Sequence, residues 1–412
     1  MSAAVWAVTL PAEWPPAPTA MSFTALRAIE QCPLSWSLSR ATYPHLWGER
    51  GYPGRAMIGT ISGQILHLAM ESISSSLVLS EGDSTVESRV VSVLISLGGL
   101  TAVLRKAADA VCSSLRTNPR INHRLPELLQ LIERELPSLR QRLQVLLSEL
   151  SPDIRPPTGM LTRRTTQARS SLPNGVHTEV TLRHPILKWV GKADLIYLSD
   201  EVCEIVDFKT GDPSDEHQLQ LRLYALLWAR DRMLNPPGRL ASRLRVLYSG
   251  RVQDVPPPSE RELAQLEQEL NARTEAARGA IGRRPPPATP AQGVCDWCDV
   301  KHLCSPFWEP ETQVQLYGVE RPLPCRADLE VRVRERLGAS SWKATVTIRS
   351  VLRDRSEVLI RANPSDIHFA SLIESGQLYR ILDAYVLPGS DESSGLPIIR
   401  LAPSSELFAV GS

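Results

Sequence analysis

Two carboxylates and a lysine stand close together in the segment GKADLIYLSDEVCEIVDFKTG. Asp207 and Lys209 are two residues apart, so a strand through this stretch places both side chains on one face. If a turn of two residues precedes that strand, Asp194 lies directly across from Asp207, whereas a three-residue turn shifts it by one position. Opposed carboxylates repel each other unless a cation lies between them. The pattern therefore predicts a site for a hard divalent ion, Mg²⁺ or Mn²⁺.

Lys209 beside such an ion can orient or deprotonate an attacking water, or stabilise charge that develops on a phosphate. D-x-K triplets also occur on ordinary solvent-facing strands, which is the alternative interpretation. Here the flanking residues, EIV before and TG after, are those of a buried strand followed by a turn. The chain also has 40 arginines against six lysines, so a simple surface cation would more commonly be arginine. Both features favour a functional lysine.

Other polar residues could reach the same site. Gln220 and Tyr224 are four apart on a predicted helix and share a face, although a surface amide beside a core tyrosine fits that spacing equally well. His67 lies on an otherwise apolar helix face, where a buried core histidine is the alternative to a metal ligand. Glu179, on the strand before Asp194, is either a further carboxylate of the site or an edge-strand charge.

A second group of residues has metal-ligand spacing. Cys295, Cys298 and Cys304 form the pattern C-x2-C-x5-C, which allows three thiolates to surround one metal centre. Cys32, in a Cys-Pro pair that ends a helix, is a candidate fourth ligand, and His302 is the competing one, which would make a zinc site. The other cysteines are predicted to be ordinary buried thiols: Cys112, Cys203 and Cys325.

Taken together, these motifs resemble the RecB-like branch of the PD-(D/E)XK nucleases that carries an iron–sulfur cluster, to which AddB-type and CRISPR-associated exonucleases belong. The resemblance covers about residues 20–310. It depends on the order and spacing of short motifs, which are SFTALRAIEQCP, GTISGQILH, GKADLIYL, VDFKTG, QLRLY and CDWCDVKHLC. It implies an α/β fold with a restriction-endonuclease-like core, in which helices flank a mixed central sheet.

The resemblance also implies roles for individual residues. A catalytic Mg²⁺ or Mn²⁺ would be bound by His67, Asp194 and Asp207 with help from the backbone carbonyl of Phe208. Lys209 would be the catalytic lysine, and Gln220 and Tyr224 would match the family's QxxxY motif beside the active site. The ligands of a [4Fe–4S] cluster would be Cys32, Cys295, Cys298 and Cys304, which favours Cys32 over His302. In the family this cluster is chiefly structural and supports DNA binding.

Hydrophobic periodicity predicts the elements that must position these residues. Ser22 is expected to cap a helix that ends near Cys32 and Pro33, and residues 85–150 are expected to be helical throughout. The other predicted helices are about Met57–Ile73, Asp215–Arg232 and Ser259–Ile281. The predicted strands are Val176–Leu182, Ile186–Leu198, Val202–Phe208 and Leu244–Tyr248.

The chain divides into a Pro-rich lead-in (1–20), a nuclease domain (21–310) with a helical insertion (85–150), and a C-terminal β domain (320–412). The last is predicted to have three strands, a helix and two strands, which is the topology of an OB-fold, with any small barrel or sandwich as the alternative. Its aromatic residues are predicted to be either base-stacking platforms or core residues: Trp342, Tyr379 and Tyr385. A basic loop at 155–175 is predicted to contact phosphates through Arg155, Arg163, Arg164 and Arg169.

Composition restricts the class of protein. Hydrophobic residues at 42% and charged residues at 22% exclude a wholly disordered chain. The net charge of +1 gives no overall attraction to nucleic acid, and seven cysteines argue against a secreted disulfide scaffold. The N-terminus lacks the pattern of a signal peptide, and the apolar run Val90–Leu104 is shorter than a membrane span and is expected to be a buried helix. A cytoplasmic protein without a membrane partner is therefore expected.

The sequence thus predicts a metal-dependent DNA nuclease, an exonuclease that acts on single-stranded or unwound DNA ends in DNA repair, recombination or antiviral defence. No P-loop motif occurs, so a helicase or another member of a repair or defence complex would have to unwind the DNA. The alternative is a non-catalytic subunit of such a complex that binds DNA ends. A nuclease stabilised by zinc rather than by an iron–sulfur cluster is a third hypothesis.

Overall fold

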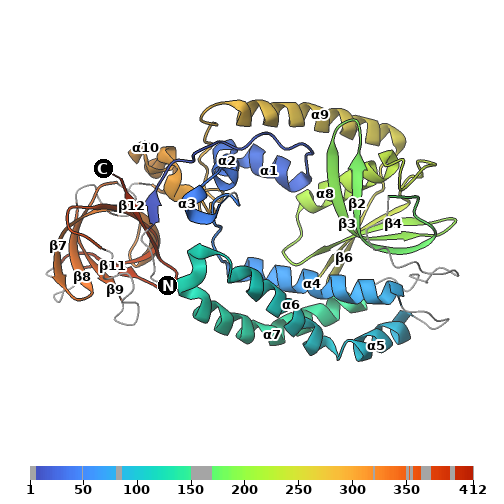
Figure 1. The fold of residues 1–412 in the computed structure, drawn as a ribbon, viewed down its shortest axis with the longest axis horizontal. Coiled ribbons are helices and arrows are strands. Elements are labelled where there is room, and N and C mark those ends of the chain that lie inside the picture. Colours follow the sequence, from blue (N-terminus) through green and yellow to red (C-terminus); the bar gives the residue numbers. More distant parts are fainter. Residues whose placement is uncertain are drawn as a thin grey trace.

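The computed structural model describes residues 6–48, 50–79, 86–149, 169–318, 321–348, 352, 356–362, 373–389 and 395–411. Two sheets, one of them surrounded by helices, form the fold of these residues (Figure 1). The helices are α1 (Phe23–Gln31), α2 (Pro33–Arg40), α3 (Pro44–Trp47), α4 (Ile58–Leu79), α5 (Val86–Ser96), α6 (Leu100–Leu115), α7 (Leu125–Ser148), α8 (Asp215–Arg230), α9 (Glu260–Gly282) and α10 (Pro310–Tyr317), with 3₁₀ turns η1 (Pro119–Arg124), η2 (Lys301–Leu303) and η3 (Ser305–Trp308). The strands are β1 (Trp6–Val8), β2 (Gly175–His184), β3 (Trp189–Leu198), β4 (Cys203–Lys209), β5 (Arg243–Tyr248), β6 (Arg251–Val255), β7 (Cys325–Gly338), β8 (Ser341–Val346), β9 (Glu357–Ala362), β10 (Leu378–Leu387), β11 (Ile398–Leu401) and β12 (Glu406–Val410).

The first sheet has the order β2-β3-β4-β5-β6, and β4 and β5 are its parallel pair. A tight turn joins β3 to β4, where the amide of Ser199 donates to the carbonyl of Val202 at 2.8 Å. The register pairs Leu198 with Cys203 and continues to Leu195 opposite Val206. The next position on each strand is Asp194 and Asp207. The register expected for a two-residue turn is thus confirmed.

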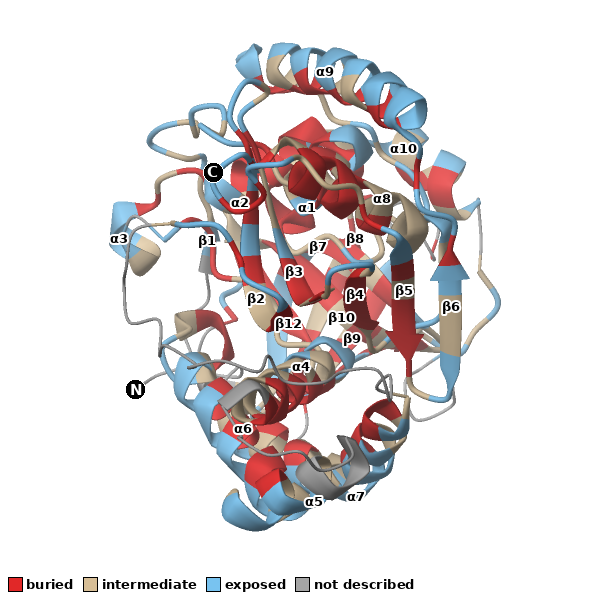
Figure 2. Ribbon diagram, turned by 90° about the vertical axis from the view of Figure 1, so that its right-hand side faces the viewer, coloured by how far each residue is buried: buried red, intermediate tan, exposed pale blue. Residues whose placement is uncertain are grey.

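Helices cover both faces of this sheet (Figure 2). Side chains alternate along β4, so Cys203 and Ile205 join one hydrophobic cluster while Val206 and Phe208 join the other. The first cluster packs against α1, α8 and α9, and the second against α4 and the helices that follow it. Burial on both faces explains why apolar residues occur at both odd and even positions of this strand.

The predicted helical stretch at 85–150 contains α5, η1, α6 and α7, and it packs against α4. The chain breaks between α5 and α6 at Gly98 and Gly99, whose φ angles of 83° and 89° suit glycine. Within the described residues no single helix is long and apolar enough to cross a membrane. In this part of the chain one bent pair of helix segments, Val90–Ser96 and Leu100–Leu115, is together long and apolar enough to do so, on length and composition alone.

The second sheet closes into a five-stranded barrel in the order β7-β8-β9-β11-β10, because β10 also pairs with β7. Strand β12 pairs with β10 outside this ring, and β1 pairs with β12 in parallel. Part of the Pro-rich segment 1–20 therefore belongs to the folded structure, since Trp6–Val8 adds a strand to the C-terminal sheet (Figure 1). The predicted helix after the third barrel strand falls largely at 363–372, outside the described residues.

The structure bears on two predictions about nucleic-acid contacts. Trp342 and Tyr379 lie inside the barrel with 0% and 2% of their surface exposed, because alternate side chains of β8 and β10 point inward. They are core residues rather than base-stacking platforms, while Tyr385 is half-buried. Arg169 is bound to the buried carboxylate of Asp231, so its guanidinium is already occupied. Three arginines of the basic loop lie outside the described residues: Arg155, Arg163 and Arg164.

Candidate active site

The two opposed carboxylates lie on the neighbouring inner strands β3 and β4 of the first sheet. Asp194 and Asp207 are 6% and 2% exposed. The Oδ2 atom of Asp194 accepts a hydrogen bond of 2.6 Å from the amide of Phe208, which fixes this carboxylate against the neighbouring strand. Burial, and then the nearby charge of Asp207, raise the pKa of Asp194 well above its ordinary value, although the Phe208 amide opposes the shift. Two buried carboxylates in this arrangement are stabilised by a cation.

A histidine on helix α4 lies close to one of these carboxylates. The Nε2 atom of His67 lies 3.9 Å from Asp194 and 3.7 Å from Oε1 of Glu179 on β2. One donor atom from each of the three residues lies within 4.8 Å of the others. The structure thus places Glu179 in the site, which resolves the open choice between a pocket carboxylate and an edge charge. Asp207 lies outside this group of three, and its carboxylate is paired with Lys209 instead.

Lys209 is held by a row of polar side chains. Its Nζ atom lies 2.8 Å from Oδ2 of Asp207 and donates to Oε1 of Gln220 at 2.9 Å. The amide nitrogen of Gln220 in turn donates to the hydroxyl of Tyr224 at 2.6 Å. Burial, followed by the charge of Asp207, raises the pKa of Tyr224, so its hydroxyl stays protonated. Gln220 and Tyr224, four residues apart on α8, therefore position the lysine and are not ordinary surface residues.

Close packing of α8 on β3 makes this row possible. A Cβ atom on Gly191 would lie 2.8 Å from Cδ1 of Leu227 and 2.8 Å from Cε1 of Tyr224. Only glycine lets the two elements approach this far. Its neighbour Lys192 forms an ion pair with Glu179. Lys192 was not among the predicted site residues, although its being one of six lysines in an arginine-rich chain could have indicated it.

The donor set is suited to a divalent ion. One imidazole nitrogen and several carboxylate oxygens converge from α4, β2 and β3, and carboxylate oxygens are the ligands that Mg²⁺ and Mn²⁺ prefer. Burial first, and then repulsion from Asp207, raise the pKa of Asp194, and a bound cation would relieve this repulsion. His67, Glu179 and Asp194 would hold such an ion, with Asp207 on the adjacent strand.

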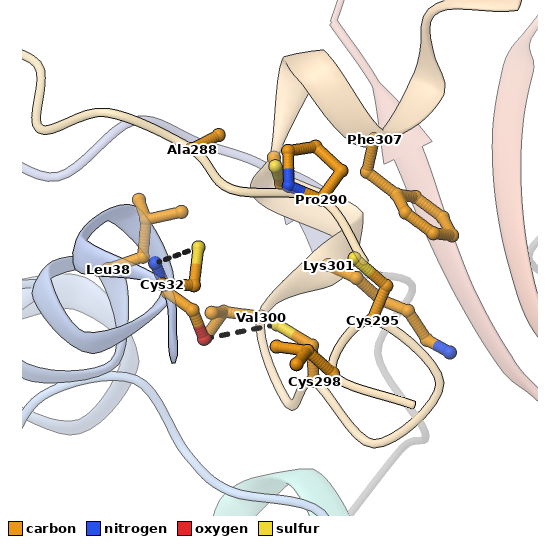
Figure 3. A pocket seen from close by; sticks show the side chains of 12 residues that line it. Cys32, Leu38, Ala288, Pro290, Cys295, Cys298, Val300, Lys301 and Phe307 are labelled. Atoms are coloured by element: carbon orange, nitrogen blue, oxygen red, sulfur yellow. Dashed lines mark hydrogen bonds between the residues drawn. The ribbon is translucent and has the colours of Figure 1, made fainter. Parts of the chain in front are cut away.

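The cysteines form a separate site at the C-terminal end of α1. Cys32 lies at the junction of α1 and α2, and a later loop brings Cys295, Cys298 and Cys304 to the same small cavity (Figure 3). Ser35 connects the two segments, because its amide donates to Sγ of Cys32 at 3.4 Å and its hydroxyl lies 3.2 Å from Sγ of Cys298.

These thiols are poor thiolates without a partner. Burial raises the pKa of Cys295 and Cys298, and it raises that of Cys304 to about 12. A metal centre deprotonates coordinating thiols outright, and the ammonium of Lys301 lines the same cavity. The cavity thus brings four thiols together, but among the described residues only His67, Glu179 and Asp194 have donor atoms within 4.8 Å of one another.

His302, the competing fourth ligand, does not line this cavity. Its ring is fully buried and stacks on Phe408 of β12 with 3.8 Å between the ring centroids. Burial, and then the charges of Arg120 and Arg380, lower its pKa well below the ordinary value, so it stays neutral. The geometry thus favours Cys32 as the fourth side chain.

Comparisons with known proteins bear on the first site. The family model described as PD-(D/E)XK nuclease superfamily matches residues 20–305, which include the motifs of both sites. No curated protein matches the chain. A solved structure titled "Crystal structure of SSO0001" is 16% identical, and the match covers 61% of this chain and 96% of that one. Its TM-score of 0.20 carries no argument about the fold.

Proposed function

Because the chain belongs to the PD-(D/E)XK nuclease superfamily, we propose that it is a DNA nuclease that degrades single-stranded or unwound ends. It would act as an exonuclease beside a helicase or another partner in DNA repair or antiviral defence. The observation that carries the proposal is the junction of β3 and β4, where two buried carboxylates lie beside a lysine whose ammonium is held in place by Gln220. Such an arrangement suits phosphodiester hydrolysis.

A divalent ion bound here would neutralise charge on the scissile phosphate and lower the pKa of water. His67, Glu179 and Asp194 supply the side chains that would hold it. Lys209 contributes a positive charge beside Asp207, where it can orient water or stabilise charge on the phosphate. The hydrogen bond from Lys209 to Gln220 restricts the conformations of this side chain.

A cleavage assay tests the proposal. End-labelled single-stranded DNA is incubated with Mg²⁺ or Mn²⁺ and wild-type protein, Asp207→Ala, or the control Glu201→Ala in the exposed turn of the same hairpin. Wild type and control should shorten the strand, and Asp207→Ala should be slower by at least about a hundredfold. Equal degradation by wild type and Asp207→Ala would place the active site elsewhere. Binding without cleavage in either metal would favour the non-catalytic subunit.

We also propose that the four cysteines hold a [4Fe–4S] cluster. The support is that Cys32 and three cysteines of one later loop line a single cavity that excludes His302. Purified protein should contain iron and sulfide, and Cys298→Ser should lose both while Cys325→Ser, outside the cavity, keeps them. Zinc without iron in the purified protein would replace this proposal with the zinc-stabilised nuclease.

We propose further that the C-terminal barrel is an OB-like module. Five strands close in the non-sequential order β7-β8-β9-β11-β10, and β9 and β11 run parallel. A closed five-stranded Greek-key barrel with such crossing connections is the architecture of OB-folds. A solved structure in which the strands left this order would overturn the assignment.

A further inference from the structure

A groove of about 990 Å³ separates the first turn of α4 and part of α7 from the barrel. Its remaining wall comes from the loop that carries Cys295, Cys298 and Cys304, called the cysteine loop below, and from α10 (Figure 1). This groove contains neither the carboxylates of the candidate active site nor the four thiols. We propose that it binds a single strand of nucleic acid and leads it to that site. The inference rests on the proposed nuclease function.

The first observation is an exposed tryptophan. Trp297 stands between Cys295 and Cys298, lines the groove and is 68% exposed. So large an apolar surface in contact with water is unfavourable unless something covers it in the working protein. Because the loop is tied to α1 and α2 through the cysteine cavity, Trp297 is presented on a fixed support. A flat ring on a fixed support is a platform on which an unpaired base can stack.

The second observation is the charge along the walls. Five cations line the groove against three carboxylates, and the carboxylates are already occupied. Asp296 accepts from the hydroxyl of Tyr317 at 2.8 Å, Asp328 lies 2.6 Å from Lys301, and Asp383 binds Arg326. The same ion pairs occupy Lys301 and Arg326, and Arg55 and Arg124 are paired with Glu406 and Glu127. Among the ion pairs of the described residues, Arg321 is thus the lining cation left to meet a polyanion. The cationic residues that line the groove are Arg55, Arg124, Lys301, Arg321 and Arg326.

Arg321 is the cation best placed to meet a phosphate. Its guanidinium lies over the ring of Tyr317, with its Cζ atom 3.9 Å from the ring centroid. Among the ion pairs of the described residues it has no carboxylate partner, and its hydrogen bond is to the carbonyl of Arg326 at 3.5 Å. Aromatic rings interleaved with such arginines are the pattern of proteins that bind single strands through base stacking and backbone contacts.

The third observation connects the groove to the candidate active site. Gly59 and Thr60 line it at the start of α4, and His67 lies two turns further along the same helix. Gly59, Gly63 and His67 follow at intervals of four, so they lie along one side of the helix. Space is open where a side chain on Gly59 would project, and His67 itself is 40% exposed. Between them a Cβ atom on Gly63 would lie 3.0 Å from Oγ1 of Thr210, the residue after Lys209, so the helix side meets the active-site strand at this point. At ~1.5 Å per residue the distance is about 12 Å, a short path for an extended strand.

A duplex is the less suitable occupant. Stacking on Trp297 requires the face of an unpaired base, and paired bases inside a helix do not present one. The groove should therefore prefer a single strand to a duplex of the same sequence.

Binding assays in EDTA test the inference without hydrolysis. Fluorescence anisotropy with labelled oligodeoxythymidylate is measured for the full chain, for Trp297→Ala and Trp297→Phe, and for Arg321→Glu. The matched charge control is Arg261→Glu, on exposed α9. We expect the Kd to rise about tenfold or more for Trp297→Ala and for Arg321→Glu, and to change little for Trp297→Phe and for the control. Iron content and unfolding temperature show that the variants remain folded.

The failures of the two proposals are distinguishable. If both Trp297→Ala and Arg321→Glu bind the strand as wild type does, or if wild type does not bind it or prefers a duplex, the groove is not the strand-binding site. Cleavage that still depends on Asp207 would leave the nuclease proposal standing in that case. Binding that depends on Trp297 in a protein that never cleaves would instead support the groove and overturn the nuclease.

Discussion

Lys209 has a defined position because both of its partners are side chains with little freedom of their own. Asp207 is buried in the sheet, and Gln220 is held by the hydroxyl of Tyr224. An ammonium on a flexible four-carbon chain otherwise samples many conformations. At this scale the function of Gln220 is to position the lysine rather than to contact DNA.

Replacement of Gln220 by alanine should therefore reduce kcat by about 10- to 100-fold with little change in KM, because Lys209 loses one of its two anchors. Steady-state cleavage of labelled single-stranded DNA measures both constants. Gln218→Ala is the matched control, since this half-buried glutamine lies on the same helix and contacts Asp215 instead. A variant of Gln220 with wild-type kcat would show that the hydrogen bond does not matter for the reaction.

Glu179 has an unusual backbone conformation. Its φ of 54° lies in the left-handed region, which is strained for a residue with a side chain, and it interrupts the pairing of β2 with β3. The consequence is that its carboxylate joins His67 and Asp194 instead of continuing the strand's alternation. Strain retained at this point indicates a functional constraint.

Glu179→Gln should raise the Mg²⁺ concentration needed for half-maximal cleavage by about tenfold, because one negative ligand is lost while the shape is kept. A metal titration of the cleavage rate gives this value. Glu201→Gln, in the exposed turn of the β3–β4 hairpin, should leave the titration unchanged. An unaltered titration for Glu179→Gln would mean that this carboxylate is not a metal ligand.

Most residues of this site could be predicted from sequence because their motifs are local. Asp207 and Lys209 lie on one strand, and Gln220 and Tyr224 on one helix, so periodicity alone places each pair on a shared face. The position of Glu179 could not be predicted, since it depends on a positive φ that a strand pattern does not reveal. The burial of Trp342 was left open, although β8 alternates Trp342, Ala344 and Val346 with Ser341, Lys343 and Thr345, a pattern that predicts Trp342 to point inward.

At the scale of elements, α8 and β3 contact each other at Gly191, where a side chain would overlap Leu227 and Tyr224. Gly191→Ala should push α8 away from the sheet and carry Tyr224 with it. Overpacking of this kind costs about 1–3 kcal/mol, so both the unfolding temperature and the cleavage rate should fall.

Thermal unfolding followed by circular dichroism, together with the cleavage assay, tests this. Gly279→Ala on α9 is the control, because open space surrounds the position and alanine favours the helix, so its unfolding temperature should stay the same or rise. If Gly191→Ala is as stable and active as wild type, the helix has room to move and the contact does not set the position of Tyr224.

Several elements with a local signal were predicted, but β6, which pairs with β5 across a short turn, was missed, as was a strand defined by a distant partner. Ser22 caps α1, with its hydroxyl accepting from the amide of Ala25, and the capping box of Ser259 begins α9, as expected. The three-residue strand β1 was missed, because its only partner is β12 at the other end of the chain. So short a segment carries no periodicity, and its strand character comes from tertiary pairing.

At the scale of the whole molecule, one buried guanidinium joins four segments. Arg120, 1% exposed, donates to Glu406 of β12 at 2.6 Å and 3.0 Å. It also donates to the carbonyl oxygens of Pro53, at 2.9 Å, and Asp299, at 2.7 Å. Since Asp299 follows directly after Cys298, the barrel, the helical region and the cysteine loop share this contact. It therefore fixes one side of the groove between them.

This buried pair predicts a pH dependence of stability. Burial by itself would raise the pKa of Glu406, but the charge and hydrogen bonds of Arg120, together with the charge of Arg55, outweigh burial and lower the pKa below the ordinary value of 4.5. A depressed pKa in the folded state means that the stabilisation is complete above the ordinary value and is lost as the pH falls through the folded value. Glu406→Gln removes the pair and leaves Arg120 buried, which costs about 3–5 kcal/mol at neutral pH.

Thermal unfolding midpoints from pH 7 down to acid pH should show a large gap between wild type and Glu406→Gln that narrows below about pH 4.5, as wild-type Glu406 also becomes neutral. Glu127→Gln is the matched control, because Glu127 is 40% exposed and pairs with Arg124 at the surface, where such a pair is worth ~1 kcal/mol or less. A gap between wild type and Glu406→Gln that stayed constant across this range would mean that the loss comes from repacking. In that case the charge of Glu406 would not hold the barrel to the rest of the molecule.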